Sequence, residues 1–120
     1  MKTSVVILNY LTYQKSIKCI QHLQKEHDVI DNIIIIDNNS GNESLEKIYK
    51  YLKKNNLTSV FYSAEKELSD SKYILVQNNI NSGYARGNNL GIKIALHIES
   101  DYILILNNDI YITQGAITEM

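Results

Sequence analysis

The residues that could do chemistry lie in three polar clusters, each directly after an apolar run. The clusters are Asn9-Tyr10, Asp37-Asn38-Asn39 and Asn107-Asn108-Asp109. The apolar runs are short and rich in Val, Ile and Leu, which is typical of strands buried on both faces of a parallel sheet. The carboxyl ends of such strands meet at one edge, where open α/β sheets bind ligands. Any single cluster could be a simple turn, but three at one edge favour a binding site.

The last cluster contains the carboxylate that could hold a metal ion. Magnesium commonly takes one or two protein carboxylates and shares the rest of its shell with water and substrate phosphates. Asp109 with the amides of Asn107 and Asn108 would be a weak site on its own. The same three residues would suit a metal–diphosphate complex.

A segment with glycines four residues apart is the candidate phosphate site. It contains Gly83, Gly87 and Gly91. This spacing is neither the G-x-G-x-x-G dinucleotide fingerprint nor a P-loop, which argues against a classical NAD enzyme and a P-loop NTPase. Three polar side chains stand in the first turns of the predicted helix: Arg86, Asn88 and Asn89. A helix N-terminus with an arginine suits an anion, whereas close packing of the glycines and a solvated arginine would be the purely structural alternative.

Strands and helices alternate along the chain. Apolar runs predict strands over residues 4–8, 33–36, 73–76 and 102–106, with shorter ones over 59–62 and 110–112. Helical spacing predicts a first helix over about 12–26, with Thr12 as its cap, and a second helix that begins after a capping box from Ser40 to Glu43. Further helices are predicted over about 84–98 and from Gln114 onward. This order predicts a three-layer α/β/α fold with a mostly parallel, Rossmann-like sheet.

Composition narrows the class of protein. The 120 residues predict one domain, 1–120, and the net charge of −1 gives no global attraction to nucleic acid or to an anionic membrane. The apolar runs are shorter than a membrane span, no signal-peptide cleavage region follows the N-terminus, and there is a single cysteine, Cys19. We therefore expect a cytoplasmic protein, at most peripheral at the inner face of the membrane.

Four segments together resemble the nucleotide-sugar-binding half of a family 2 glycosyltransferase with the GT-A fold. They cover residues 5–10, 35–40, 81–91 and 104–109, and their order and spacing agree with that family. The resemblance is greatest to rhamnosyltransferase-like bacterial members that build cell-surface polysaccharides. It implies that the chain is the N-terminal, donor-binding portion of such an enzyme, truncated before the acceptor half.

The resemblance also implies roles for individual residues. Asn9 and Tyr10 would line the base and ribose pocket, and Asp37, beside Asn39, would accept a hydrogen bond from the imide of uracil or thymine. The diphosphate of a UDP-, dTDP- or GDP-sugar would be surrounded by Asn81, Gly83, Arg86, Asn88 and Asn89. Asn107-Asn108-Asp109 would correspond to the metal-binding motif, with Asp109 as the ligand of Mg²⁺ or Mn²⁺ and Asn107 in place of the usual first acid.

The implied reaction is inverting sugar transfer to a saccharide or lipid-linked acceptor. Such a reaction needs a general base, which in this family follows the metal motif. Glu119 is the only acid after Asp109 and comes too early to match it, so the catalytic base is unassigned. Two alternatives remain. One is a non-catalytic nucleotide-binding or self-associating module with an exposed sheet edge, and the other is a nucleotidyltransferase, which usually carries a basic glycine-rich loop after the first strand.

Overall fold

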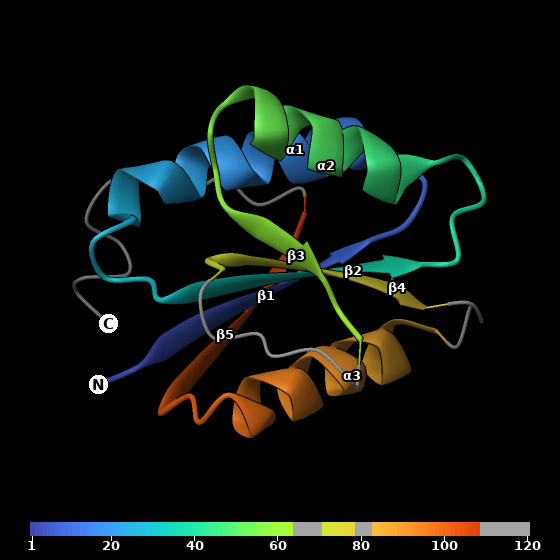
Figure 1. Cartoon of the computed structure of the whole chain (residues 1–120). Coiled ribbons are helices and arrows are strands. Elements are labelled where there is room, and N and C mark those ends of the chain that lie inside the picture. The colour runs from blue at the N-terminus through green and yellow to red at the C-terminus, as the bar shows by residue number, and fades with distance from the viewer. Residues whose placement is uncertain (64–70, 79–82, 109–120) are drawn as a thin grey trace.

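Five parallel strands form a single sheet at the centre of the molecule (Figure 1). The computed structural model describes residues 1–63, 71–78 and 83–108. The strands lie in the order β3-β4-β2-β1-β5. Their bounds are β1 Thr3–Asn9, β2 Asn32–Asn38, β3 Ser59–Phe61, β4 Tyr73–Asn78 and β5 Tyr102–Asn107. The predicted strands within the described residues are confirmed, whereas the strand predicted over 110–112 and the helix from Gln114 lie outside them.

Helices cover both faces of this sheet. They are α1 Tyr13–Leu23, which continues into the short 3-10 helix η1 Gln24–Glu26, α2 Ser44–Lys54 and α3 Gly83–His97. Figure 1 shows α1 and α2 on one face and α3 on the other. The three-layer α/β/α arrangement predicted from the sequence is therefore confirmed, and every strand pairing that the structure describes is parallel.

The apolar runs supply both faces of the sheet because successive side chains of a strand point in opposite directions. In β2, Ile33 and Ile35 pack towards α1 and α2, whereas Ile34 and Ile36 pack towards α3. All seven residues of β2 are buried. A central strand covered on both sides cannot alternate between apolar and polar residues, which is why the sequence shows a continuous apolar run.

The strand order places a topological switch point at the carboxyl ends of β2 and β4. The chain leaves β2 towards α2 on one face and leaves β4 towards α3 on the opposite face (Figure 1). The helices that follow these two neighbouring strands therefore lie on opposite faces of the sheet. In open α/β sheets this topological switch point is the usual position of a ligand site.

Helix α3 approaches the sheet so closely that two of its positions have no room for a side chain. A Cβ atom at Gly91 would lie 2.4 Å from Val6 Cγ1 and 2.8 Å from Ile36 Cδ1, and one at Gly87 would lie 2.6 Å from Leu8 Cδ1. Close packing, one of the two interpretations of these glycines, is therefore a property of the fold. It also places the start of α3 beside the carboxyl end of β1.

Two predicted helix features differ from the structure. Thr12 precedes α1 but makes no capping hydrogen bond, because its hydroxyl donates to the carbonyl of Tyr10 (3.3 Å). Helix α2 begins at Ser44 rather than after Ser40, so the predicted capping box does not form.

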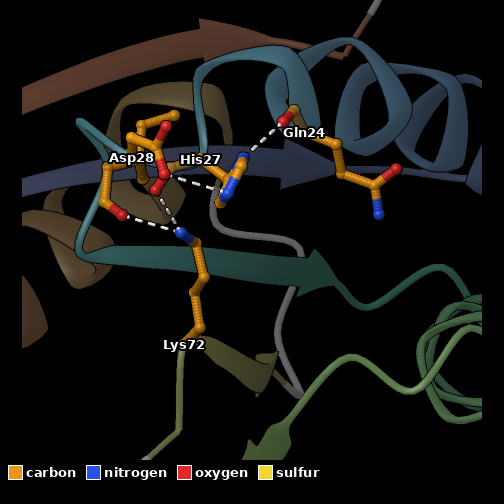
Figure 2. Close-up of polar contacts among 5 residues, drawn as sticks. Gln24, His27, Asp28 and Lys72 are labelled. Carbon is orange, nitrogen blue, oxygen red and sulfur yellow. Dashed lines mark hydrogen bonds and ion pairs between the residues drawn. The ribbon is translucent and has the colours of Figure 1, made fainter.

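At the opposite, amino edge of the sheet a lysine fixes the loop that enters β2. Lys72 Nζ donates to the carbonyl oxygens of His27 (2.7 Å) and Ile30 (2.8 Å), as Figure 2 shows. Burial lowers the pKa of Lys72, and the nearby charges of Asp31 and Asp28 oppose that shift. This contact positions β2 in the sheet and lies at the other end of the strands from the polar clusters.

Candidate functional site

The three polar clusters meet at the carboxyl edge of the sheet. In the strand register Asn9 stands opposite Asp37, Asp37 stands opposite Gln77, and Asn107 stands opposite Leu8. Residues separated by up to about a hundred positions in the sequence are thus neighbours at one edge. The prediction that these clusters share one edge is confirmed for their described residues, and Asp109 lies outside them.

Asp37 is the centre of the polar network at this edge. Its side chain is 2% exposed, and its carboxylate accepts four hydrogen bonds. Oδ1 accepts from Asn9 Nδ2 (2.8 Å) and from the Ser40 hydroxyl (2.5 Å). Oδ2 accepts from the Ser40 backbone N–H (3.1 Å) and from Gln77 Nε2 (3.0 Å). A carboxylate has about four acceptor positions, so the protein itself fills all of them.

The donors to Asp37 differ in their exposure. Asn9 is fully buried and Ser40 is buried, whereas Gln77 is exposed. Gln77 Nε2 also lies within reach of the Asp37 and Asn78 carbonyl oxygens, at 3.5 and 3.2 Å. Gln77 is therefore the donor that an incoming ligand could replace at the least cost.

Asn9 has both ends of its side chain occupied inside the protein. Its Nδ2 donates to Asp37, and its Oδ1 accepts from the hydroxyl of Ser16 (2.6 Å). Its exposure is 0%. The role of Asn9 in a nucleotide pocket remains a prediction, and this burial favours an indirect role in which Asn9 orients Asp37. Tyr10, the next residue, is 46% exposed.

The loops after β1 and β2 are bonded to each other. Leu11 N donates to the Ser40 hydroxyl (2.8 Å), and Asn42 Nδ2 donates to the Leu11 carbonyl (3.0 Å). Leu11, Asn39 and Glu43 have positive φ angles of 63°, 58° and 60°. Leu and Glu rarely adopt this conformation, and such strained positions persist where the surrounding contacts determine them and gather at binding sites.

An open depression of about 280 Å³ lies over the switch point between β2 and β4. Three acidic side chains, Asp37, Glu43 and Glu46, contribute to its lining together with Asn39 and the amide of Gln77. These carboxylates would repel a phosphate group. The depression is therefore suited to a neutral group that presents N–H donors.

The first turns of α3 form a second, less acidic part of the edge. Arg86 and Asn89 are exposed, and Asn88 is 6% exposed. Among the residues that the structure describes, the buried Asn88 Oδ1 atom has no hydrogen-bond partner. An unsatisfied buried acceptor costs about 1–3 kcal/mol, so this atom is a candidate for a donor that the bound state supplies. Gly83 begins the helix, whereas Asn81 lies outside the described residues.

Comparison of the sequence with protein-family models assigns the chain to a family. The model of the family described as "Glycosyl transferase family 2" matches residues 4–120. The chain belongs to glycosyl transferase family 2. None of the curated proteins compared with it matches.

Solved structures of similar fold agree with this family. The crystal structure of S. aureus TarS 1-349 has a TM-score of 0.71 and 21% identity, over 99% of this chain and 31% of that one. TarS 1-349 in complex with UDP-GlcNAc gives a TM-score of 0.72 at 21% identity, over 99% and 30%, and a complex of the same protein with UDP is also similar. At this identity the likeness shows the fold, and our family 2 chain spans about a third of the length of TarS 1-349.

The metal corner that the sequence predicts for this family 2 chain, Asn107-Asn108-Asp109, lies only in part within the described residues. Asn107 is exposed, and Asn108 Nδ2 donates to Thr12 Oγ1 (2.8 Å) and Ser16 Oγ (3.1 Å). Asp109 lies outside the described residues, and within them no three His, Cys, Asp or Glu side chains gather as a metal site. Amide oxygens are acceptable ligands for a hard cation, so the donor chemistry fits a divalent ion when Asp109 completes it.

Four residues of the site make contacts that were not predicted from the sequence. They are Ser16, Ser40, Gln77 and Asn108. Ser16 had a recognisable signal, because it is a polar residue on the buried helical face that carries Cys19 and Leu23. Ser40 was interpreted as a helix cap, whereas its hydroxyl binds Asp37.

No helix within 1–63, 71–78 and 83–108 is both long enough and apolar enough to cross a bilayer.

Proposed function

We propose that the chain forms the donor-binding part of a glycosyltransferase that uses a nucleotide-diphospho-sugar. The observation that carries this proposal is the buried carboxylate of Asp37, which neutral donors hold at the switch point between β2 and β4. Family membership supplies the reaction class, and the UDP and UDP-GlcNAc complexes of TarS supply a precedent for the ligand.

Asp37 would recognise the base by accepting a hydrogen bond from it. Uracil, thymine and guanine each present a ring N–H donor on the pairing edge, and an acceptor such as Asp37 can bind it. The corresponding ring nitrogen of cytosine and adenine is itself an acceptor and would face the carboxylate lone pairs. The base would displace the exposed amide of Gln77 from Asp37 Oδ2 and take its place as the donor. Tyr10 and Asn39, both exposed near this switch point, would contact the base or ribose.

The diphosphate would lie away from the acidic depression, against the start of α3. Exposed Arg86 and Asn89 stand there at the positive end of the helix dipole, with Asn88, Gly83 and Asn81 as further candidate contacts. Asn107 and Asp109 would hold Mg²⁺ or Mn²⁺ at the neighbouring strand end. Such an ion, when bound, would stabilise the charge that develops on the leaving diphosphate.

The transfer step would be inverting, with direct attack of an acceptor hydroxyl on the anomeric carbon. That step needs a general base, and no residue of this chain is assigned that role. We infer that the acceptor belongs to cell-surface polysaccharide synthesis and that the protein acts in the cytoplasm or at the inner face of the membrane. These finer points follow from the resemblance alone.

Isothermal titration calorimetry with UDP, dTDP and GDP, each with and without MnCl₂, tests the donor site. We expect measurable binding of at least one of these nucleotides, with a higher affinity when Mn²⁺ is present. ADP should bind with a much lower affinity. Protein that is folded by circular dichroism but gives no heat with any of the three would refute the proposal.

A second function, self-association, has one observation in its favour. Strand β5 is at the edge of the sheet among the described strands, and its Tyr102 and Ile105 are 56% and 39% exposed. Exposed apolar residues on an edge strand favour pairing with another chain. Sedimentation velocity over a hundredfold range of concentration would detect it, and an unchanging monomer would exclude it.

A further inference from the structure

A continuous chain of hydrogen bonds joins the base-reading end of the site to the metal corner. Asn108 Nδ2 donates to Ser16 Oγ (3.1 Å), and Ser16 Oγ donates to Asn9 Oδ1 (2.6 Å). Asn9 Nδ2 then donates to Asp37 Oδ1 (2.8 Å). Asn108 directly follows β5, and the other three side chains come from α1, β1 and β2, so the series runs along the carboxyl edge from the end of β5 to β2.

Every bond in this chain points towards Asp37. Ser16 has one hydroxyl proton, which it gives to Asn9, so it can only accept from Asn108. A flip of the Asn9 amide would set its oxygen against a carboxylate oxygen and its NH₂ group against the hydroxyl of Ser16. The carboxylate, which accepts only, therefore fixes the direction of the whole series.

Water cannot take over the central links. Ser16 and Asn9 are both 0% exposed, and the next donor, Asn108, is half-buried. Hydrogen bonds in such a chain polarise one another, and the low dielectric of a buried site strengthens this effect. A change in what Asp37 binds will therefore alter the bond that Asn108 makes, directly before Asp109 in the sequence.

We propose that Ser16 is a positioning residue that couples occupation of the base site at Asp37 to the orientation of Asn108 at the metal corner. This inference rests on the proposed function, because it assumes that a base binds at Asp37. Ser16 touches neither nucleotide nor metal in this account. It acts by transmitting the state of Asp37 through Asn9 to the residue that precedes the metal ligand.

Uridine separates this coupling from a direct contact between the ligand and Asn108. It has the base but no phosphate group, so it does not form a metal–diphosphate complex beside Asn108. We would titrate ¹⁵N-labelled protein with uridine in the absence of metal and follow the side-chain NH₂ signals of Asn9 and Asn108. In the wild type both signals should move with the same Kd. In Ser16→Ala, which removes one oxygen atom, the Asn9 signal should still move and the Asn108 signal should stay in place.

A matched control is available in the same sheet. Ser4 is also fully buried, and its hydroxyl bonds that of Ser100 at the amino edge (2.5 Å), so Ser4→Ala removes a comparable hydrogen bond far from the site. Both NH₂ signals should respond to uridine in this variant as they do in the wild type. A general loosening of the fold would instead alter both variants alike.

The affinities provide a second reading. With Mn²⁺ present, Ser16→Ala should raise the Kd of UDP by a factor at least about five times the factor by which it raises the Kd of uridine. A fivefold difference is the low end of usual coupling between two sites. Equal losses for the two ligands, or an Asn108 signal in the wild type that ignores uridine while Asn9 responds, would overturn the coupling and leave the donor site intact. A wild type in which neither signal responds to uridine or to UDP would overturn the proposed function and this inference together.

Discussion

Replacement of Asp37 by asparagine tests whether the carboxylate organises the carboxyl edge. The two side chains have nearly the same shape, so Asp37→Asn exchanges one acceptor oxygen for an NH₂ group and removes the charge. Oδ1 accepts from Asn9 and the Ser40 hydroxyl, and Oδ2 accepts from the Ser40 backbone and Gln77. The NH₂ group must therefore face two donors whichever oxygen it replaces.

The expected loss follows from these partners. At the Oδ2 position, exposed Gln77 can turn its own amide to present oxygen, but the backbone N–H of buried Ser40 cannot turn. One buried donor is left unsatisfied, at about 1–3 kcal/mol, and the bonds on the remaining oxygen lose their charge assistance. Relief from burying a charge offsets part of this cost. We expect the free energy of unfolding to fall by about 2 kcal/mol.

Urea denaturation followed by circular dichroism measures this loss. Asp31→Asn is the matched control, because Asp31 is exposed and its carboxylate accepts one backbone hydrogen bond, from Thr3 N (2.8 Å). The control should change the free energy of unfolding by less than about 0.5 kcal/mol. If Asp37→Asn costs no more than Asp31→Asn, the network around Asp37 does not organise this edge.

Three further predictions concern packing, pH and ligand access. Gly91→Ala should lower the free energy of unfolding by about 2 kcal/mol in urea melts and should cost more than Gly87→Ala, because it meets two core side chains and Gly87→Ala meets one flexible leucine. Burial raises the pKa of Tyr73 to about 12, with a hydrogen bond from Gln24 acting in the opposite direction. Tyrosine in the unfolded chain ionises near pH 10, so the contribution of buried, neutral Tyr73 to the free energy of unfolding is complete below pH 10. This contribution, about 2 kcal/mol, is lost between pH 10 and 12. The free energy of unfolding of Tyr73→Phe, measured against pH, should lack that loss. Gln77→Ala should leave UDP affinity by calorimetry equal to or higher than that of the wild type, since it frees an acceptor position on Asp37, and a tenfold loss would show that Gln77 is an essential contact.

The strands and their parallel arrangement were predictable because their sequence signal is strong. Four consecutive isoleucines in β2 can be buried only between two helical layers. Once the strands are parallel, the residues after them must share an edge, so the meeting of Asn9 with Asp37 followed from topology. The close approach of α3 was likewise foreseen from Gly87 and Gly91.

The partners of Asp37 were not predictable from local patterns. Ser40 and Glu43 have the spacing of a capping box, but the carboxylate of Asp37, three residues earlier, binds the Ser40 hydroxyl first. Helix α2 then begins at Ser44, whose N–H donates to Asn42 Oδ1 (3.1 Å). A hydrogen bond to the charged side chain three residues earlier thus outweighed the helix cap.

The burial of Asn9 and the role of Ser16 depend on contacts between distant elements. Ser16 and Asn108 are separated by 92 residues, and the register of β1 with β5 brings them together. A sequence shows that a polar residue stands on an apolar helix face, but it does not show which polar group it will meet. The shared edge was therefore predictable, whereas the series of hydrogen bonds along it was not.

Discrimination between UDP and CDP tests the central claim most directly. The two ligands share ribose and diphosphate and differ in whether the ring nitrogen facing Asp37 is a donor or an acceptor. With MnCl₂ present, calorimetry should show UDP binding at least tenfold more tightly than CDP to the wild type, and this ratio should collapse in Asp37→Asn. Equal affinities in the wild type, or an unchanged ratio in the variant, would contradict a donor site built around this carboxylate.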